Sequence, residues 1–221
     1  MNHTIVHSLK HVLLVGGANI GRNDLNTLLT GMPTVVAVDG GADHLLNNDV
    51  QPAAVIGDLD SLSAAARLRF ADILHHITEQ DTVDFEKALS RIDAPLIYAI
   101  GFSGGRLDHT LAVLHVMARH RDRRIVLISD EDVSMIVPRT GLTLDLPADT
   151  RVSLMPLVET HCTTTGLRWP LAEALSPLGK TSPSNAAVGG RVHITASQPL
   201  IVTLPRSQLL AHDWATTTAQ Q

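Results

Sequence analysis

The chain has 221 residues, of which 44% are hydrophobic and 18% are charged, and its formal net charge is −5. This length allows a sizeable core, in one large domain or in two small ones. Because acidic and basic residues are mixed along the chain, the sequence excludes a basic nucleic-acid surface and a polybasic membrane-binding segment.

The apolar run near the N-terminus, VLLVGGANI, is short and runs into glycines, so it predicts a first strand rather than a signal peptide. No segment has the length and apolarity of a membrane span. The single cysteine, Cys162, excludes an intrachain disulfide and fits a reducing compartment. We therefore expect a soluble cytoplasmic protein.

Up to about Asp130, short apolar runs alternate with helix-like stretches, a pattern typical of βαβ units and a parallel sheet. The predicted strands are His11–Val15, Thr34–Val38, Ala53–Ile56, Ile73–His76, Leu96–Ile100 and Arg124–Ser129. The predicted helices are Asp24–Leu29, Ala64–Phe70, Val83–Ile92 and Leu107–Arg119. We interpret the charged stretch Arg119–Arg124 as an exposed loop.

From Val133 onward the pattern changes to a period-two alternation of apolar and polar residues, in GLTLDL, RVSLMPL, RVHITA and LIVTL. This alternation predicts antiparallel strands with one buried face. We therefore expect an α/β fold with two domains and a tail. They are a Rossmann-like domain with a parallel sheet (residues 1–138), a smaller antiparallel β-sandwich domain (139–214) and a flexible tail (215–221).

Acidic residues and glycines follow several of the predicted strands. Ligands of an open parallel sheet bind outside the carboxyl ends of its strands. Carboxylates that converge there would repel one another, and a hard divalent cation such as Mg²⁺, bridging substrate phosphates, removes the conflict. The residues are Asp39, Gly40 and Gly41 after the second strand, Asp58 and Asp60 after the third, Gln80, Asp81 and Asp84 after the fourth, and Gly104, Gly105, Arg106 and Asp108 after the fifth.

The glycines and the arginine fit phosphate as the ligand. Glycine lets backbone N–H groups approach phosphate oxygens, and Arg106 offers a planar fork of donors. Each acid, taken singly, reads equally well as a helix cap or a turn residue. Neither G-x-G-x-x-G nor G-x-x-x-x-G-K-[ST] occurs, so no motif predicts a dinucleotide site or a P-loop.

Six segments, in order, resemble motifs of the thiamine pyrophosphokinase family. Four resemble its signature blocks: VDGGADHLL (Val38–Leu46), PAAVIGDLDSLS (Pro52–Ser63), EQDTVDFEKAL (Glu79–Leu89) and GFSGGRLDHTLAVL (Gly101–Leu114). Two resemble its thiamine-side motifs: TTTGLRWPL (Thr163–Leu171) and SPSN (Ser182–Asn185). The resemblance implies transfer of pyrophosphate from ATP to thiamine, giving thiamine diphosphate and AMP. It also implies a homodimer that holds thiamine where the two subunits meet.

The resemblance also implies roles for particular residues. On the nucleotide side, Mg²⁺ would be held by Asp58, Asp60 and Asp84, and the site would be completed by Asp39, Arg106 and Asp108. Apart from the resemblance, position after the predicted strands and side-chain chemistry add further nucleotide-side candidates: Gly40, Gly41, Gln80, Lys87, Gly105 and His109. Lys87 has a second interpretation, as part of a solvated helix face. On the thiamine side, Trp169 of one subunit would stack on the thiamine bound by the other, with Ser184 and Asn185 nearby.

Two departures from the family pattern bear on these roles. Val83 stands where the family usually has threonine before the acid, so the division of duty between Asp81 and Asp84 stays open. Leu59 replaces the usual aromatic residue between the paired acids, and we expect it to point into the core. We expect either Asp81 or Asp108 to accept the hydroxyl proton.

Three other functions remain alternatives. A pyrophosphokinase of the same fold would act on a pterin or another alcohol. A phosphatase of the haloacid-dehalogenase type would use the D-x-D acids for covalent catalysis, although that motif usually follows the first strand and here follows the third. A non-catalytic regulator would bind nucleotide or thiamine without turnover.

Overall fold

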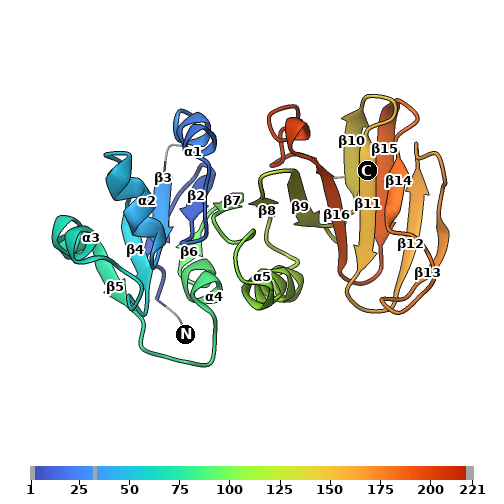
Figure 1. Ribbon diagram of the computed structural model, residues 1–221. Coiled ribbons are helices and arrows are strands. Elements are labelled where there is room, and N and C mark those ends of the chain that lie inside the picture. Colours follow the sequence, from blue (N-terminus) through green and yellow to red (C-terminus); the bar gives the residue numbers. More distant parts are fainter. Residues whose placement is uncertain (1–2, 32–33, 218–221) are drawn as a thin grey trace. The chain divides into compact units, whose positions relative to one another are not determined.

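The computed structural model of the chain describes residues 3–31 and 34–217 (Figure 1). The chain forms two compact units. The first runs to Val116 and includes Leu127–Asp130, and the second contains Met117–Val126 and continues from Glu131. The division into residues 1–138 and 139–214 therefore stays a prediction.

The first unit contains a parallel sheet in the strand order β7-β2-β3-β4-β5. Except for the edge strand β5, its strands are almost continuous apolar runs, which is what burial on both faces requires. They are β2 (Val12–Val15), β3 (Thr34–Val38), β4 (Ala54–Gly57), β5 (Leu74–His76) and β7 (Ile97–Ile100).

Helices occupy the connections between these strands, as parallel pairing requires (Figure 1). They are α1 (Arg22–Leu29), α2 (Gly41–Asn47), α3 (Ala64–Arg69), α4 (Asp84–Leu89) and α5 (Leu107–Arg119), with a short 3₁₀ turn, η1 (Ala71–Ile73), before β5. Ser63 caps α3, because its hydroxyl accepts a hydrogen bond from the N–H of Ala66.

The sequence predicted most of these elements. The predicted strands of this region are confirmed to within one residue at each end, including β8 (Ile125–Ile128), which lies at the boundary of the two units. The sequence missed α2 and the parallel pair formed by the two-residue strands β1 (Val6–His7) and β6 (Ile92–Asp93). Two residues carry too little periodicity for a sequence signal.

Two glycines make close approaches that no other residue would allow. A Cβ on Gly41 would lie 1.9 Å from the carbonyl oxygen of Val15, so only glycine lets α2 begin so close to the end of β2. Gly101 has φ 79°, and a Cβ there would lie 2.4 Å from the carbonyl oxygen of Gly16. These contacts bring the loops after β2, β3 and β7 close together.

The second unit consists mainly of antiparallel strands. One set pairs in the order β14-β11-β16-β9, and a separate four-stranded sheet has the order β10-β15-β12-β13. The strands are β9 (Asp132–Ile136), β10 (Leu142–Leu146), β11 (Arg151–Pro156), β12 (Thr160–Thr165), β13 (Ala172–Leu175), β14 (Ser184–Ala186), β15 (Gly190–Ala196) and β16 (Leu200–Pro205), followed by a 3₁₀ turn, η2 (Arg206–Gln208).

The period-two pattern predicted four of these strands, β10, β11, β15 and β16, and did not predict β9, β12, β13 or β14. In β10, Leu142, Leu144 and Leu146 are buried, whereas the residues between them are more exposed. Leu142 lies opposite Ile194 of β15. The expectation of an antiparallel C-terminal region is thus confirmed. Among the helices that the structure describes, none combines the length and apolar character needed to cross a bilayer.

The interpretation of Arg119–Arg124 as an exposed loop is wrong for Arg121, which is only 4% exposed. Its guanidinium group donates hydrogen bonds to the carbonyl oxygens of Val137 (2.9 Å), Ser197 (3.1 Å) and Ala196 (2.6 Å). These are contacts across long stretches of sequence, which a local charge pattern does not reveal. Arg121 therefore ties together three separate segments of the second unit.

Replacing Arg121 with methionine should lower the free energy of unfolding by about 3 kcal/mol, because three carbonyl oxygens lose their donor in the interior. Urea denaturation followed by circular dichroism measures the effect. The matched control is Arg139→Met, since Arg139 is largely exposed and pairs with Asp122 at the surface. This control should change stability by less than about 1 kcal/mol. Equal effects of both changes would contradict the structural role given to Arg121.

Candidate active site

A cavity of about 790 Å³ lies in the first unit, where β2, β3, β4 and β7 end. The predicted residues that line it are Asp39, Gly40, Asp58, Asp60, Asp84, Gly105, Arg106 and His109. They come from loops and helix starts that follow different strands. The convergence expected at the carboxyl edge of a parallel sheet is therefore present.

Asp39 is the most buried acid of this cavity. It follows β3 in a left-handed backbone conformation with φ 46°, and it is 9% exposed. Its Oδ1 finds no hydrogen-bond partner among the described residues. Burial raises the pKa of the Asp39 carboxyl, and repulsion from Asp84 and Asp60 adds to this, whereas hydrogen bonds from Ser61 and the Gly40 backbone partly offset it. In the absence of a bound cation, the ionised form of Asp39 therefore destabilises the folded protein.

The turn after β4 places two further acids beside Asp39. Leu59 has φ 63° and is buried, as expected from the sequence, and its carbonyl oxygen accepts a hydrogen bond of 2.6 Å from Arg67. Carboxylate oxygens of Asp39, Asp58 and Asp60 lie within 4.8 Å of one another. This group offers the spacing and the oxygen donors that a hard divalent cation prefers.

Asp84, at the start of α4, lines the same cavity but is bound to a lysine. Lys87 is 2% exposed, and its Nζ lies 2.9 Å from Oδ1 of Asp84 and 3.1 Å from Oδ2 of Asp58. Burial alone would raise the pKa of Asp58, but the hydrogen bond from Lys87 and others from Asp60 leave it lowered. Burial would likewise lower the pKa of Lys87, and the two acids raise it.

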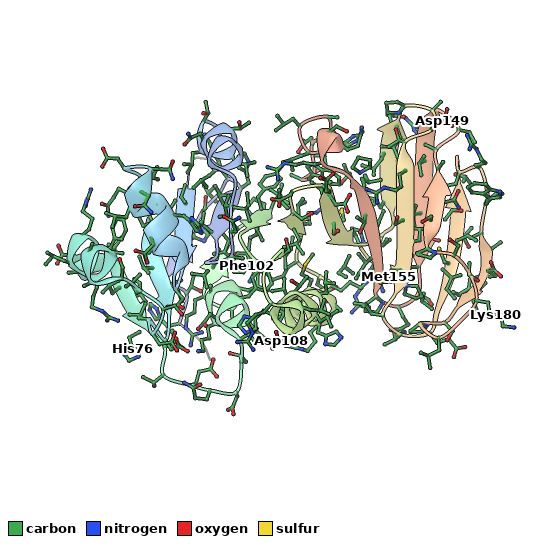
Figure 2. The ribbon with its side chains drawn as sticks, in the orientation of Figure 1. His76, Phe102, Asp108, Asp149, Met155 and Lys180 are labelled. Atoms are coloured by element: carbon green, nitrogen blue, oxygen red, sulfur yellow. The ribbon has the colours of Figure 1, made fainter. Side chains whose placement is uncertain are left out.

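At the start of α5, Arg106 and Asp108 form a bidentate salt bridge. Nε of Arg106 donates to Oδ1 of Asp108 (3.1 Å), and its second terminal nitrogen donates to Oδ2 (2.5 Å). The pKa of Asp108 is lowered by the hydrogen bonds from Arg106. Both oxygens of this carboxylate are therefore engaged, while Arg106 itself lines the cavity. Phe102 and Asp108 are labelled in Figure 2.

Other predicted residues do not line the cavity. In the described part of the chain, Gly41 lies in the first turn of α2, Gln80 and Asp81 lie in the exposed loop before α4, and Lys87 lies behind two of the acids. Among the lining residues that sequence reasoning missed are Asp43, His44 and Asn47 of α2, Ser61, Phe85, Phe102 and Thr110. The block VDGGADHLL contained the signal for the first two, although the helix itself was not predicted.

The second unit has a cavity of about 460 Å³ of different character. Its lining is largely apolar, with Leu154, Leu171 and Leu175 among its residues. Trp169 lines it with 57% of its surface exposed, and the guanidinium of Arg168 lies 5.6 Å from the centre of the Trp169 ring. Ser184 and Asn185 also line this cavity, so the structure brings together the three residues of the expected thiamine side.

Asn185 is bound to the backbone of Trp169. Its Oδ1 accepts hydrogen bonds from the N–H groups of Trp169 (3.2 Å) and Ala186 (2.9 Å), and its Nδ2 donates to the carbonyl oxygen of Trp169 (2.6 Å). Pro170 follows and has no N–H, so ordinary strand pairing cannot continue there. The Asn185 side chain substitutes for that pairing and fixes the backbone of Trp169.

Two family models match the chain. One is described as thiamin pyrophosphokinase, catalytic domain, and matches residues 25–128. The other is described as thiamin pyrophosphokinase, vitamin B1 binding domain, and matches residues 142–201. The two matches fall on the regions that contain the acidic cavity and the apolar cavity.

Curated relatives and solved structures agree with these matches. Thiamine pyrophosphokinase 1 of Oryza sativa subsp. japonica is 28% identical over 200 residues, covering 81% of this chain and 75% of the relative. Thiamine pyrophosphokinase of Bacillus subtilis is 28% identical over 173 residues, covering 73% and 78%.

Among solved structures, thiamin pyrophosphokinase from Geobacillus thermodenitrificans aligns with a TM-score of 0.75 at 26% identity and covers 88% of this chain and 96% of its own. That from Candida albicans aligns with a TM-score of 0.74 at 18% identity, covers 93% and 94%, and supports the fold alone. Since the two family models together match well over half of the 221 residues, the chain belongs to the thiamine pyrophosphokinase family.

Proposed function

We propose that this protein transfers pyrophosphate from ATP to the hydroxyl group of thiamine, giving thiamine diphosphate and AMP. The observation that carries the proposal is the convergence of five carboxylates (Asp39, Asp43, Asp58, Asp60 and Asp84) and Arg106 on one cavity. Membership of the thiamine pyrophosphokinase family supplies the acceptor. In this proposal the first domain is Rossmann-like and binds the nucleotide, and the second is a β-sandwich that binds thiamine.

The donor set of the cavity fits Mg²⁺. Oxygen atoms of Asp39, Asp58 and Asp60 lie within 4.8 Å of one another, and the buried Oδ1 of Asp39 finds no partner among the described residues. We assign the ion to these three acids, with Asp84 of the expected set beside them. When bound, Mg²⁺ would neutralise the triphosphate and so favour attack on the β-phosphorus.

The remaining residues bind and orient the triphosphate. Arg106, held by Asp108, presents its guanidinium to the transferring group, and Gly40 and Gly105 leave room for backbone N–H groups near phosphate oxygens. The thiamine oxygen bonds to the β-phosphorus, the bond from that phosphorus to the α–β bridging oxygen breaks, and AMP leaves with the oxygen.

The hydroxyl proton goes to a base that the geometry does not single out. Both oxygens of Asp108 are engaged by Arg106, and its pKa is lowered, so this carboxylate is a poor proton acceptor. Asp81 lies in the exposed loop before α4. We assign Asp108 to orienting Arg106 and keep Asp81 as the remaining sequence candidate.

On the acceptor side, Trp169 offers a flat π surface to the cationic thiamine. Arg168 covers one side of the ring, so the other side is the one available to the substrate. Because the amide of Asn185 is committed to the Trp169 backbone, we give Asn185 a positioning role and leave direct contact to Trp169 and Ser184. This apolar, aromatic lining favours thiamine over a phosphatase substrate.

We further propose a homodimer in which thiamine is held between the cavity of one subunit's first domain and Trp169 of the other subunit. The support is the family resemblance and the chemical difference between the two cavities: one is acidic, the other apolar. The expected cytoplasmic location belongs to the same proposal. It fits a chain whose single cysteine, Cys162, is free and cannot form an intrachain disulfide.

The activity is tested by incubating the protein with ATP, Mg²⁺ and thiamine and measuring thiamine diphosphate and AMP by chromatography. Asp60→Asn should lower kcat/KM at least about 100-fold, because the site loses charge that stabilises the ion and the phosphates. Asp72→Asn, an exposed acid in η1, is the matched control and should keep full activity. The same assay tests the rival functions. A pterin pyrophosphokinase would use a hydroxymethyl pterin in place of thiamine, and a phosphatase would release inorganic phosphate. Either activity, without formation of thiamine diphosphate, would replace the proposal.

The burial of the Asp39 carboxylate, to which repulsion from Asp84 and Asp60 adds, has a measurable effect on stability. Because the folded protein raises the pKa of this carboxyl, its ionised form destabilises the fold at neutral pH. This penalty shrinks as the pH falls below the raised pKa and is gone once the pH is below the ordinary pKa of the carboxyl. Without metal at pH 7, Asp39→Asn should therefore raise the free energy of unfolding. Urea denaturation at pH 7 and at pH 3 should give a gain at pH 7 that vanishes at pH 3. A loss of stability at pH 7 would contradict this account.

The shared site is tested by mixing two inactive variants. Asp60→Asn has a damaged acidic cavity and Trp169→Ala a damaged apolar one. If each site uses one cavity from each subunit, half of the reassociated dimers contain one intact site, so the mixture should recover about a quarter of the wild-type activity. Refolding the variants together and assaying thiamine diphosphate measures this. If activity stays at the level of the separate variants, each site is built within one chain.

A further inference from the structure

Lys87 lies in the interior although it carries a charge. Its side chain is 2% exposed, between buried residues of α4 that include Phe85 and Leu89. The backbone around it is also held, because its carbonyl oxygen accepts hydrogen bonds from Arg91 (2.8 Å) and Ser90 (3.1 Å). Burying an ammonium group is costly unless it is paired, so its partners determine what it does.

Those partners are two of the five acids that line the cavity. Nζ of Lys87 lies 2.9 Å from Asp84 and 3.1 Å from Asp58, and Oδ1 of Asp84 also accepts the N–H of Asp58 (3.3 Å). Lys87 therefore links the start of α4, through Asp84, to the turn after β4, through Asp58. Asp39 and Asp60 receive no such charge from Lys87, and Oδ1 of Asp39 finds no partner among the described residues.

This arrangement does not suit a lysine that binds phosphate. Lys87 does not line the cavity, whereas both of its acidic partners do. To reach a phosphate, its ammonium would have to leave two carboxylates and thereby strip them of their counter-charge. The acids stand between Lys87 and the cavity, so the lysine acts on a bound ligand through them.

We propose that Lys87 is an internal counter-cation of the acidic cluster, which keeps Asp58 and Asp84 in place and weakens the binding of a free divalent cation. The inference rests on the proposed function, from which the ion follows. A positive charge that shares Asp58 with the ion repels it and withdraws part of the negative charge that would attract it. Phosphate oxygens restore that negative charge. The site therefore favours a metal ion that arrives together with a nucleotide over a free ion.

The test uses Mn²⁺ alone as the probe, with the nucleotide-free full chain. Free Mn²⁺ is counted by electron paramagnetic resonance during titration of the wild type, Lys87→Met and Lys180→Met. Lys180 is an exposed lysine in the second unit and serves as the control. Lys87→Met should bind Mn²⁺ with a Kd at least about tenfold lower than the wild type. Lys180→Met should match the wild type.

A Kd in Lys87→Met that is unchanged, or higher than that of the wild type, overturns the proposal. Unchanged affinity means that Lys87 does not act on the ion, and weaker binding means that it only orients the acids. A purely structural role would lower stability without tightening Mn²⁺ binding. The direction of the change in affinity thus separates the three roles.

If Lys87→Met fails to fold, the same comparison is made in a background with one acid fewer. Asp84→Asn is compared with the double variant Asp84→Asn/Lys87→Met. In the double variant, Asp58 is the only acid that loses the positive charge of Lys87. The double variant should again bind Mn²⁺ at least about tenfold more tightly than the single variant, and equal or weaker binding overturns the proposal. Thiamine diphosphate formation by the wild type is measured separately, so failure of this inference is distinguishable from failure of the proposed function.

Discussion

Mutual repulsion among carboxylates is the constraint on which the first unit depends. Parallel strands bring their carboxyl ends to one edge of the sheet, and here three of the segments that meet there carry acids: Asp39, Asp58 with Asp60, and Asp84. The protein offsets only part of their charge, through Lys87, the Ser61 hydroxyl and backbone N–H groups. Because the protein neutralises only part of the negative charge of this cluster, the cluster is suited to bind a divalent cation together with phosphates.

The framework that creates this edge was readable from the sequence. Runs such as Thr34–Val38 are continuous and rich in valine, and a strand buried on both faces has that composition. In the second unit, alternating runs such as GLTLDL predicted strands with one buried face. Leu107–Arg119 was predicted with its observed bounds, since it is long enough to show a helical period.

What the sequence did not show depends on contacts between distant residues. The helix α2 begins with Gly41, a residue that usually ends helices, and only its close approach to Val15 explains it. Arg121 sits in a charged stretch, and the carbonyl groups that bury it come from segments 16 and 75 or more residues away. Periodicity indicates which face of a helix or strand is buried, but it does not identify the distant residues that the face contacts.

The same distinction applies to the candidate site. Motifs identified the loops that carry the site, but they did not divide its residues into those that face a ligand and those that support them. Lys87 and Asn185 both belong to motif blocks, and the polar atoms of both form hydrogen bonds with neighbouring protein groups. Lys87 binds two acids, and Asn185 binds the backbone of Trp169. A substitution at either residue would therefore act on a ligand indirectly, through the geometry or charge of another side chain.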